Sequence, residues 1–448
     1  MLKDWIEVEL GDACFTTSGG TPSRSKSEYY KGTIPWVKSG ELNYGLILDT
    51  EEHISDEAVN NSSAKIFPEG TLLIALYGAT IGKLAILGVP AATNQAICGI
   101  YKNELFETKF LFNYLFHKRQ KLIEQGTGGA QPNISQTILK KLLLPLAPLP
   151  EQRAIAAKIE QLFSELDNGI ANLKTAKSKL EIYRQAILKQ AFEGELTIEW
   201  RKKKLLKIED WEIYKLGELV KTIDGDRGKN YPKSHELLDS GFCLFLSTKN
   251  VRKGEFVFDE NQFISDEKDK TLRGGKLEVN DVVITTRGTL GNVALYDERI
   301  KFKNMRVNSG MLILRVKDSN QLSQNFLMQF INSSIFFRQL KAKQSGTAQP
   351  QIPANVLREI EINLPSEVTE QTQIVQEIET RLSVCDKLNE SIEQSLEKAQ
   401  ALRQSILKKA FEGKLLSQDE LQTCRQQTDW EPAAKLLEKV KKDSKTKR

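Results

Sequence analysis

One stretch of this 448-residue chain occurs twice. Residues 184–196 read RQAILKQAFEGEL and residues 403–415 read RQSILKKAFEGKL, so ten of thirteen positions are identical at an offset of 219 residues. An identity of this length at one offset indicates an internal duplication. The fold must therefore contain the same structural unit twice, and the two units must serve similar purposes.

The repeated segments have the pattern of long helices. Apolar residues recur at alternating steps of three and four, which is the 3.5-residue period of a coiled-coil seam. Each segment runs roughly 40 residues without proline, a length of about 60 Å in a helix, and ends in Phe-Glu-Gly, with Gly194 and Gly413 suited to a helix C-terminus. We expect these two helices to pack on each other. The predicted seam residues are Ile155, Ile159, Leu162, Leu166, Leu173, Leu180 and Ile187 in the first helix, and Ile374, Ile378, Leu388, Ile392, Leu402 and Ile406 in the second.

The segments before each helix are also related, but more loosely. Trp36-Val37 aligns with Phe245-Leu246 at offset 209, and Asn94 aligns with Asn308 at offset 214. Changing offsets indicate insertions, which belong in surface loops. The pattern predicts an α+β protein: two similar α/β modules separated by two long coiled-coil helices, with a pseudo-two-fold internal repeat. The expected boundaries are 1–147 and 205–365 for the modules, 148–197 and 366–415 for the helices, and 416–448 for a basic tail.

Local patterns refine this expectation. Residues 70–76 and 281–286 are apolar runs typical of buried strands, and residues 84–87 and 293–296 are expected to be the returning strands. Residues 108–124 and 324–343 have helical spacing. The composition, with 40% hydrophobic and 27% charged residues, is that of an ordinary globular protein. Five scattered cysteines favour a reduced, cytoplasmic setting, and neither a membrane span nor a signal-peptide core is expected.

Motifs for catalysis are missing from the sequence. Gly78-Ala-Thr-Ile-Gly-Lys83 resembles a phosphate-binding loop, but it is one residue short and Leu84 stands where Ser or Thr would bind magnesium. The three histidines have no metal-ligating neighbours at the usual spacing. No methyltransferase tetrad and no cofactor-binding glycine motif is present. A degenerate nuclease cluster could escape such a search, but the sequence favours a non-catalytic protein without a metal or cofactor of its own.

The loops of both modules instead carry groups that bind DNA. Hydroxyls, amides and Lys or Arg side chains hold phosphates, while Arg, Asn and Gln read base edges in pairs of hydrogen bonds. A single loop of this kind is more often a solvated turn, but five polar loops recur in both modules. The candidate residues are Ser18, Thr21, Ser23, Arg24, Lys38, Ser39, Tyr77, Lys83, Gln131 and Asn133 in the first module, and Arg227, Lys229, Thr248, Lys249, Asn250, Arg287, Thr289, Asn292, Thr347 and Gln349 in the second.

At this point the chain resembles a known family, the specificity (S) subunits of type I restriction–modification systems. The resemblance covers nearly the whole length. It depends on the alternation of modules and helices and on four sequence elements: residues 19–42, which contain GGTPSR and IPWVKSGEL; Ala-Gln-Pro before each helix; LPEQRAIAAKIE at 149–160; and DWEPAAKLL at 429–437. The second module departs from the pattern, with Asp226-Arg-Gly-Lys229 in place of GGTP.

The resemblance implies a function. In that family each module reads one half of a bipartite, asymmetric site in double-stranded DNA, and the two helices run antiparallel and set the gap between the halves. It also implies two methyltransferase (M) subunits docked on the helices and two restriction/translocase (R) subunits, with S-adenosylmethionine, ATP and magnesium bound by these partners. Two alternatives remain: a coiled-coil scaffold without sequence-specific DNA binding, or the recognition part of a fused restriction–methylation enzyme.

Overall fold

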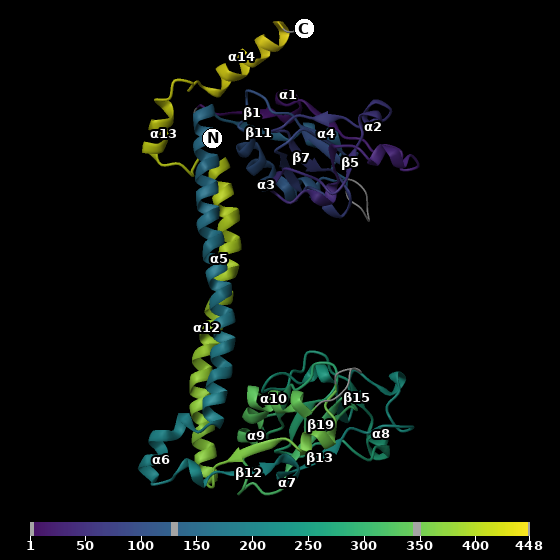
Figure 1. Cartoon of the computed structure of the whole chain (residues 1–448), viewed down its shortest axis with the longest axis vertical. Coiled ribbons are helices and arrows are strands. Elements are labelled where there is room, and N and C mark those ends of the chain that lie inside the picture. The colour runs from purple at the N-terminus through teal and green to yellow at the C-terminus, as the bar shows by residue number, and fades with distance from the viewer. Residues whose placement is uncertain (1–3, 127–132, 344–350, 447–448) are drawn as a thin grey trace. The chain divides into compact units, whose positions relative to one another are not determined.

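A computed structural model describes residues 4–126, 133–343 and 351–446. The chain forms two compact units, residues 1–173 with 394–448 and residues 174–393. Each unit holds one α/β module together with parts of two long helices (Figure 1). We call the part from β1 to β11 the first module and the part from β12 to β20 the second module.

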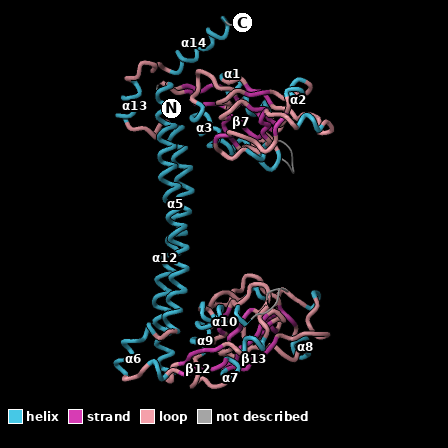
Figure 2. The backbone as a smooth tube through the Cα atoms, viewed as in Figure 1, coloured by secondary structure: helices cyan, strands magenta, loops and turns pink. Residues whose placement is uncertain are grey.

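The first module contains three sheets, whose strands are drawn as magenta segments in Figure 2. The five-stranded sheet has the order β2 (Thr16–Ser18), β10 (Ile97–Ile100), β7 (Leu72–Ala75), β8 (Leu84–Leu87) and β4 (Leu46–Ile47). The four-stranded sheet has the order β5 (His53–Ile54), β3 (Ile34–Val37), β9 (Ala91–Thr93) and β6 (Ile66–Phe67), and β1 (Ile6–Glu9) pairs with β11 (Leu143–Leu146). The helices are α1 (Leu10–Ala13), α2 (Asp56–Asn60), α3 (Thr108–Glu124) and α4 (Gln136–Lys140).

The described part of the second module repeats this topology without strands equivalent to β4 and β6. One sheet has the order β13 (Val220–Asp224), β19 (Met311–Val316), β16 (Val282–Thr285) and β17 (Val293–Leu295). Another has the order β15 (Phe263–Ile264), β14 (Cys243–Leu246) and β18 (Met305–Val307), and β12 (Glu212–Lys215) pairs with β20 (Glu361–Leu364). The helices are α7 (Leu216–Leu219), α8 (Asp266–Thr271), α9 (Gln324–Ile331), α10 (Ser334–Lys343) and α11 (Ala354–Arg358).

The correspondence extends to strand direction. The parallel pair β3–β9 places Trp36 opposite Ala92, and the parallel pair β14–β18 places Phe245 opposite Arg306. The apolar runs expected to be strands form β7, β8, β16 and β17, with every residue of β7 and β16 buried. The expected α+β fold with two similar modules is confirmed.

The expected helix over residues 324–343 is interrupted. α9 ends at Ile331 and α10 begins at Ser334. Between them the Ser333 hydroxyl donates to the carbonyl of Phe330 at 2.6 Å and accepts from the amide of Phe336 at 3.3 Å. A serine that binds nearby backbone groups offers the chain an alternative to the helical ladder, which explains the break.

The two repeated segments form α5 (Leu149–Phe192) and α12 (Val368–Phe411), of 44 residues each. Both are followed by a glycine with positive φ, +77° at Gly194 and +71° at Gly413, as a helix C-terminus of this kind requires. In the second unit Lys177 pairs with Glu393 and Arg184 with Asp386. The partner number falls by seven as the α5 number rises by seven, so the helices are antiparallel, as expected.

Burial along the predicted seam is uneven. Ile155, Ile159, Leu180, Ile187, Ile374, Ile378 and Ile406 are buried, and Leu162, Leu166, Leu173 and Ile392 are half-buried. Leu388 and Leu402 are 51% and 50% exposed. Their counterparts at offset 219, Gly169 and Tyr183, are exposed as well, and Cys385 and Ala399 are buried on α12 instead. The contact face of α12 therefore contains Cys385 and Ala399, which lie three residues before these two leucines.

A Glu-Gln pair joins each long helix to its module. Gln152, fully buried near the start of α5, accepts from the amide of Glu107 at 2.9 Å and donates to the carbonyl of Leu105 at 2.8 Å. Gln371 in α12 makes the same two bonds, to the amide of Ser323 at 2.8 Å and the carbonyl of Gln321 at 2.8 Å. Gln152 and Gln371, which lie 219 residues apart, thus anchor the starts of the two helices in the same way.

The preceding glutamates, Glu151 and Glu370, are each 2% exposed and accept from a tryptophan indole. Trp5 donates to Glu151 at 2.7 Å and Trp211 donates to Glu370 at 3.2 Å. The second donors differ. Glu370 receives the guanidinium of Arg201, from α6 (Ile198–Lys204), at 2.6 Å. Glu151 receives a second indole, that of Trp430, at 3.2 Å.

Trp430 belongs to the tail, which packs on the first unit. The tail contains α13 (Gln418–Arg425) and α14 (Ala433–Thr446), and Ala433 and Leu436 are buried in the core of that unit. Arg425 forms an ion pair with Asp4 at 3.0 Å. The tail therefore has a structural part in the fold. Among the helices that the structure describes, none is long and apolar enough to cross a membrane.

Candidate nucleic-acid interface

The loop that contains Asn133 follows helix α3. The other polar loops singled out in the sequence, and the loops that carry Asn94 and Asn308, follow the C-terminal ends of corresponding strands. We call them the strand-end loops. They follow β2, β3, β7 and β9 in the first module and β13, β14, β16 and β18 in the second. In each module two of these strands come from one sheet and two from another.

Glycines bring the first strand-end loop of each module close to its neighbours. Gly19 and Gly20 donate to the carbonyls of Ile97 and Thr93 at 3.1 and 2.9 Å. A Cβ on Gly19 would lie 2.0 Å from the Thr93 hydroxyl, and one on Gly225 would lie 2.1 Å from the carbonyl oxygen of Asn308. Since real Cβ atoms do not approach so closely, only glycine allows this contact between loops.

Corresponding asparagines tie the loops together. Asn94 donates its backbone amide to the carbonyl of Val37 at 3.0 Å, and Asn308 donates to the carbonyl of Leu246 at 3.2 Å. Each asparagine also accepts, through its side-chain oxygen, from an amide two residues ahead. The alignment of Asn94 with Asn308 in the sequence thus corresponds to the same structural position.

A second corresponding position holds the loop after β3 or β14. Glu41 accepts from the backbone amides of Lys38 at 2.7 Å and Glu51 at 2.9 Å. Asn250, 209 residues later, accepts from the amide of Ser247 at 2.9 Å and donates to the carbonyl of Glu260 at 2.9 Å. Both side chains therefore join the same two backbone segments of their modules.

This arrangement corrects one of the predicted DNA contacts. Asn250 is only 3% exposed, and its amide group is fully engaged with the backbone. It holds its loop in place, because a polar loop needs internal hydrogen bonds wherever its backbone is withdrawn from water. Asn292 is half-buried, and its side chain donates to the carbonyl of Val251 at 3.0 Å.

Two cations of the first module meet at one carboxylate. Arg24 pairs with Glu52 at 2.6 Å, and Lys38 pairs with Glu52 at 3.1 Å and with Glu51 at 2.8 Å. The hydrogen bond from Arg24, and to a smaller extent that from Lys38, keeps the pKa of Glu52 below its ordinary value. The loops after β2 and β3 are thereby joined through their charged side chains.

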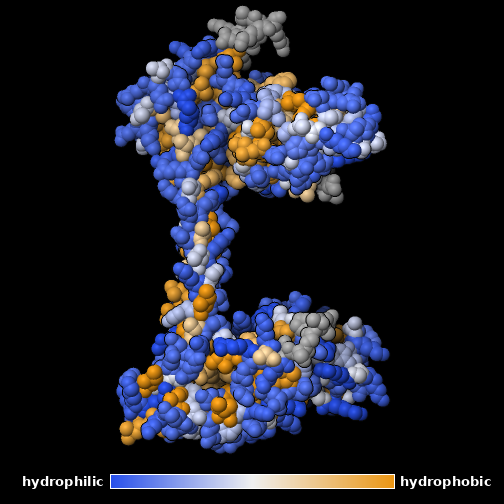
Figure 3. All heavy atoms as spheres, in the orientation of Figure 1, coloured by the Kyte–Doolittle hydropathy of each residue, from blue (hydrophilic) through white to orange (hydrophobic). Residues whose placement is uncertain are grey.

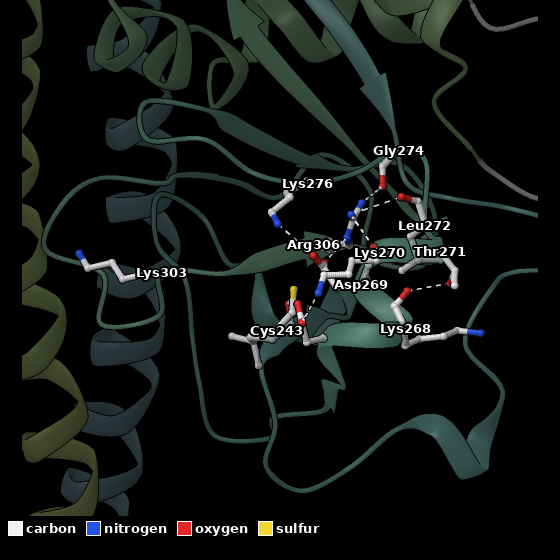
Figure 4. A network of polar contacts seen from close by, with 12 residues as sticks. Cys243, Lys268, Asp269, Lys270, Thr271, Leu272, Gly274, Lys276, Lys303 and Arg306 are labelled. Carbon is white, nitrogen blue, oxygen red and sulfur yellow. Dashed lines mark hydrogen bonds and ion pairs between the residues drawn. The ribbon is translucent and has the colours of Figure 1, made fainter.

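In the second module a buried ion pair supports the segment that holds the loop after β13 (Figure 4). Arg306 and Asp269 are 5% and 4% exposed, and Arg306 Nε donates to Asp269 Oδ1 at 2.5 Å. Arg306 also donates to the carbonyl of Gly274 at 2.6 Å. Burial alone raises the pKa of Asp269, but the hydrogen bonds from Arg306 and Lys276 outweigh it, so the pKa lies below its ordinary value.

The supported segment in turn holds the candidate DNA-binding loop. The amide of Arg273 donates to Asp226 at 2.6 Å, and the side chain of Asn230 donates to the carbonyl of Thr271 at 3.1 Å. Arg227 and Lys229, which lie between these two anchors, are exposed. Arg227 pairs with Asp224 at 3.0 Å.

The remaining candidates occupy several environments. Ser18 accepts from Gln136 at 2.7 Å, the Ser23 hydroxyl lies 2.8 Å from that of Ser25, and Thr21 bonds Gln95. Lys249 pairs with Glu260 at 2.7 Å. Asn133, Arg287 and Thr289 are exposed, whereas Ser39, Tyr77, Lys83 and Thr248 are half-buried. Gln131, Thr347 and Gln349 lie outside the described residues.

The duplicated modules agree with comparisons to known proteins. The family model of the type I restriction modification DNA specificity domain matches residues 2–175 and again residues 208–398. This chain belongs to the family of type I restriction–modification DNA specificity subunits. The predicted family resemblance is confirmed, and with it the broad function, DNA specificity in a type I system.

Individual relatives match nearly end to end. The EcoBI specificity subunit of Escherichia coli is 25% identical over 98% of this chain and 92% of its own. The MjaIX specificity subunit of Methanocaldococcus jannaschii is 26% identical over 81% and 83%. Two solved structures share the fold at 21% identity. One is a chain from a study of type I R-M assembly and conformational transition; the match covers 93% of this chain and 99% of that one, with a TM-score of 0.72. The other is HsdS of Thermoanaerobacter tengcongensis; that match covers 93% of this chain and 98% of HsdS, with a TM-score of 0.59.

The long helices of this specificity subunit expose apolar side chains (Figure 3). In the second unit these are Ile182, Tyr183, Val384 and Leu388, which are 71%, 52%, 55% and 51% exposed. Leu402 of the first unit is 50% exposed. Single exposed apolar residues are common, but several on two neighbouring helices are typical of a surface that a partner covers.

Sequence reasoning missed the residues that organise the strand-end loops. Glu41, Glu52, Asp269 and Arg306 did not stand out, because charged residues in loops are usually solvated. One signal was available: Lys38-Ser-Gly-Glu41 has the spacing at which an acidic residue binds back to the amide three positions earlier. The Arg306–Asp269 pair had no such signal, because 37 residues separate its members.

Proposed function

We propose that each module of this specificity subunit reads one half of a bipartite, asymmetric site in double-stranded DNA through its strand-end loops. The observation that carries the proposal is the double occurrence of one loop scaffold. Corresponding positions, Asn94 with Asn308 and Glu41 with Asn250, hold loops whose exposed residues differ. A constant frame with variable side chains suits two readers of different sequences.

The chemistry of the loops supports this role. Arg24 and Lys38 in the first module and Arg227, Lys229 and Arg287 in the second are cations that can bind phosphate or guanine. Hydroxyl side chains lie beside them in both modules. Phosphate contacts would position the duplex, and base contacts would supply the sequence information.

The helices α5 and α12 fit the part of spacer and docking surface. Forty-four residues correspond to about 66 Å of helix. We propose that their exposed apolar side chains receive two methyltransferase subunits, and that two restriction/translocase subunits join the complex. In this arrangement those partners supply catalysis and bind S-adenosylmethionine, ATP and magnesium, while this chain supplies only sequence recognition.

The decisive experiment is to express this chain with its methyltransferase partner in a bacterial host that lacks adenine methylation, and to map methylated adenines across the genome. A single asymmetric motif with a gap of unread bases is the expected result. No new methylation, from a complex shown to be assembled and with a methyltransferase shown to be active with another specificity subunit, would reject the proposal in favour of a scaffold.

Independence of the two readers has its own test. Exchanging residues 1–145 for the corresponding module of another specificity subunit should change one half of the methylated motif and leave the other half unchanged. The gap should also stay the same, because α5 and α12 are retained. A change in both halves would contradict independent reading.

A further inference from the structure

Arg24 of the first module is held by two aromatic rings as well as by a carboxylate. The guanidinium carbon of Arg24 lies 4.1 Å from the ring centroid of Tyr30 and 5.2 Å from that of Trp36. Its Nη1 donates to Glu52 Oε2 at 2.6 Å. Two aromatic rings and one carboxylate thus fix the plane and direction of the guanidinium, and we call these three residues the Arg24 cage.

The cage is itself held by the backbone. The Tyr30 hydroxyl donates to the carbonyl of Pro22 at 2.7 Å, and the Trp36 indole donates to the carbonyl of Gly20 at 3.1 Å. The Trp36 amide donates to the carbonyl of Glu52 at 2.9 Å. The rings meet edge to face at 5.8 Å and 78°. Each wall therefore has a fixed position before any ligand arrives.

Despite the cage, Arg24 remains available. Its side chain is 55% exposed, and Nε and Nη2 have no hydrogen-bond partner among the described residues. These two groups form a pair of parallel donors. A guanine presents a matching pair of acceptors, O6 and N7, in the major groove.

We propose that Arg24 reads a guanine in the half-site of the first module, with Glu52, Tyr30 and Trp36 as positioning residues. This inference depends on the proposed function and adds to it one base and the residue that recognises it. A phosphate contact needs only charge, and the neighbouring Lys38 supplies that as a point charge. A base edge needs a planar pair of donors in a fixed orientation. Because the cage fixes that orientation beforehand, less conformational entropy is lost on binding.

In the part of the second module that the structure describes, no arginine has an equivalent cage. Arg227 pairs with Asp224, but no aromatic ring lies against its guanidinium among the described residues. The proposal therefore concerns Arg24 alone, and Arg227 serves as an internal comparison. An arginine without a cage keeps its rotamer freedom and suits a phosphate contact.

The test uses Arg24→Lys, which keeps the positive charge and removes the planar donor pair. The full chain is expressed with its methyltransferase partner, and methylated adenines are mapped for the wild type and for Arg24→Lys. We expect the variant to lose preference at one G·C pair of one half-site by about 5- to 150-fold, with the other half-site unchanged. That half-site should be the one that exchanging residues 1–145 alters.

The outcomes separate this inference from the proposed function. A wild-type motif with an unchanged Arg24→Lys motif would overturn the inference alone, as would a first half-site without a G·C pair. Absence of any wild-type motif would overturn the proposed function. Arg227→Lys should leave base preference unchanged in both half-sites, and a relaxed base there would show that the cage is not what confers reading.

Glu52→Gln tests the positioning role without touching the arginine. The uncharged amide holds Nη1 less firmly, so preference at the same G·C pair should fall, by less than in Arg24→Lys. The matched control is Glu69→Gln, an exposed glutamate of the same module with no ion pair among the described residues, which changes net charge equally. Relaxation at that base in the control, or none in Glu52→Gln, would contradict the assignment.

Discussion

At the scale of single residues, corresponding positions of the two modules can hold very different buried side chains. Ala92 lies opposite Trp36 in the first module, and Arg306 lies opposite Phe245 in the second. The alanine needs no partner. The arginine needs Asp269, and the pair then fixes the segment that supports the Arg227 loop.

Replacement of Arg306 by methionine should therefore destabilise the second module by about 3 kcal/mol, because the buried Asp269 would keep only the ion pair with Lys276. Urea unfolding would measure the loss. Hydrogen–deuterium exchange should rise over residues 224–231, which the pair supports indirectly.

The matched control is Arg299→Met, which removes an equally charged arginine from an exposed pair with Asp297. Stability should change little there, because water replaces such contacts readily. Equal losses in the two variants would show that the buried pair has no special importance.

At the scale of elements, the duplicated helices begin in the same way and are stabilised differently. Glu370 faces the buried charge of Arg201, whereas Glu151 faces two neutral indoles, from Trp5 and Trp430. The helix start is thus common to both units, but its partners come from the linker in one unit and from the tail in the other.

The same substitution at the two positions should have unequal effects. Glu370→Gln leaves Arg201 buried without a counter-ion, at a cost of about 3–5 kcal/mol. Glu151→Gln weakens a hydrogen bond from one indole, at a cost of about 1–3 kcal/mol. Urea unfolding with hydrogen exchange at the start of each helix would compare them, and equal costs would refute the charge argument.

At the scale of the whole molecule, the length of the paired helices is proposed to set the gap in the DNA site. Adding seven residues to both α5 and α12 at paired positions should keep both half-sites and lengthen the gap. A heptad adds about 10 Å of helix, or about three base pairs at 3.4 Å each.

Adding the heptad to α5 alone should instead impair assembly, because ion pairs such as Lys177 with Glu393 would lose their register. Methylated motifs from both constructions provide the measurement. A double insertion that recognised the original gap would contradict the spacer role.

The sequence by itself determined the repeat, the two long helices and the α+β class of the modules. These follow from local patterns: a 3.5-residue apolar period, glycines at helix ends, and apolar runs between turns. The family followed too, because its motifs lie in continuous stretches such as residues 19–42 and 149–160. Patterns within one segment persist in the fold because they are set by neighbouring residues.

Only the tertiary structure decided which loop residues are free to act. Asn250 was a candidate DNA-binding residue, and the structure shows it to be an internal support. Arg24 looked like one more loop cation, and its cage forms only when β3 pairs with β5 and brings Trp36 beside Glu52. Burial, ion pairing and orientation depend on residues far apart in the chain, so no local pattern could reveal them.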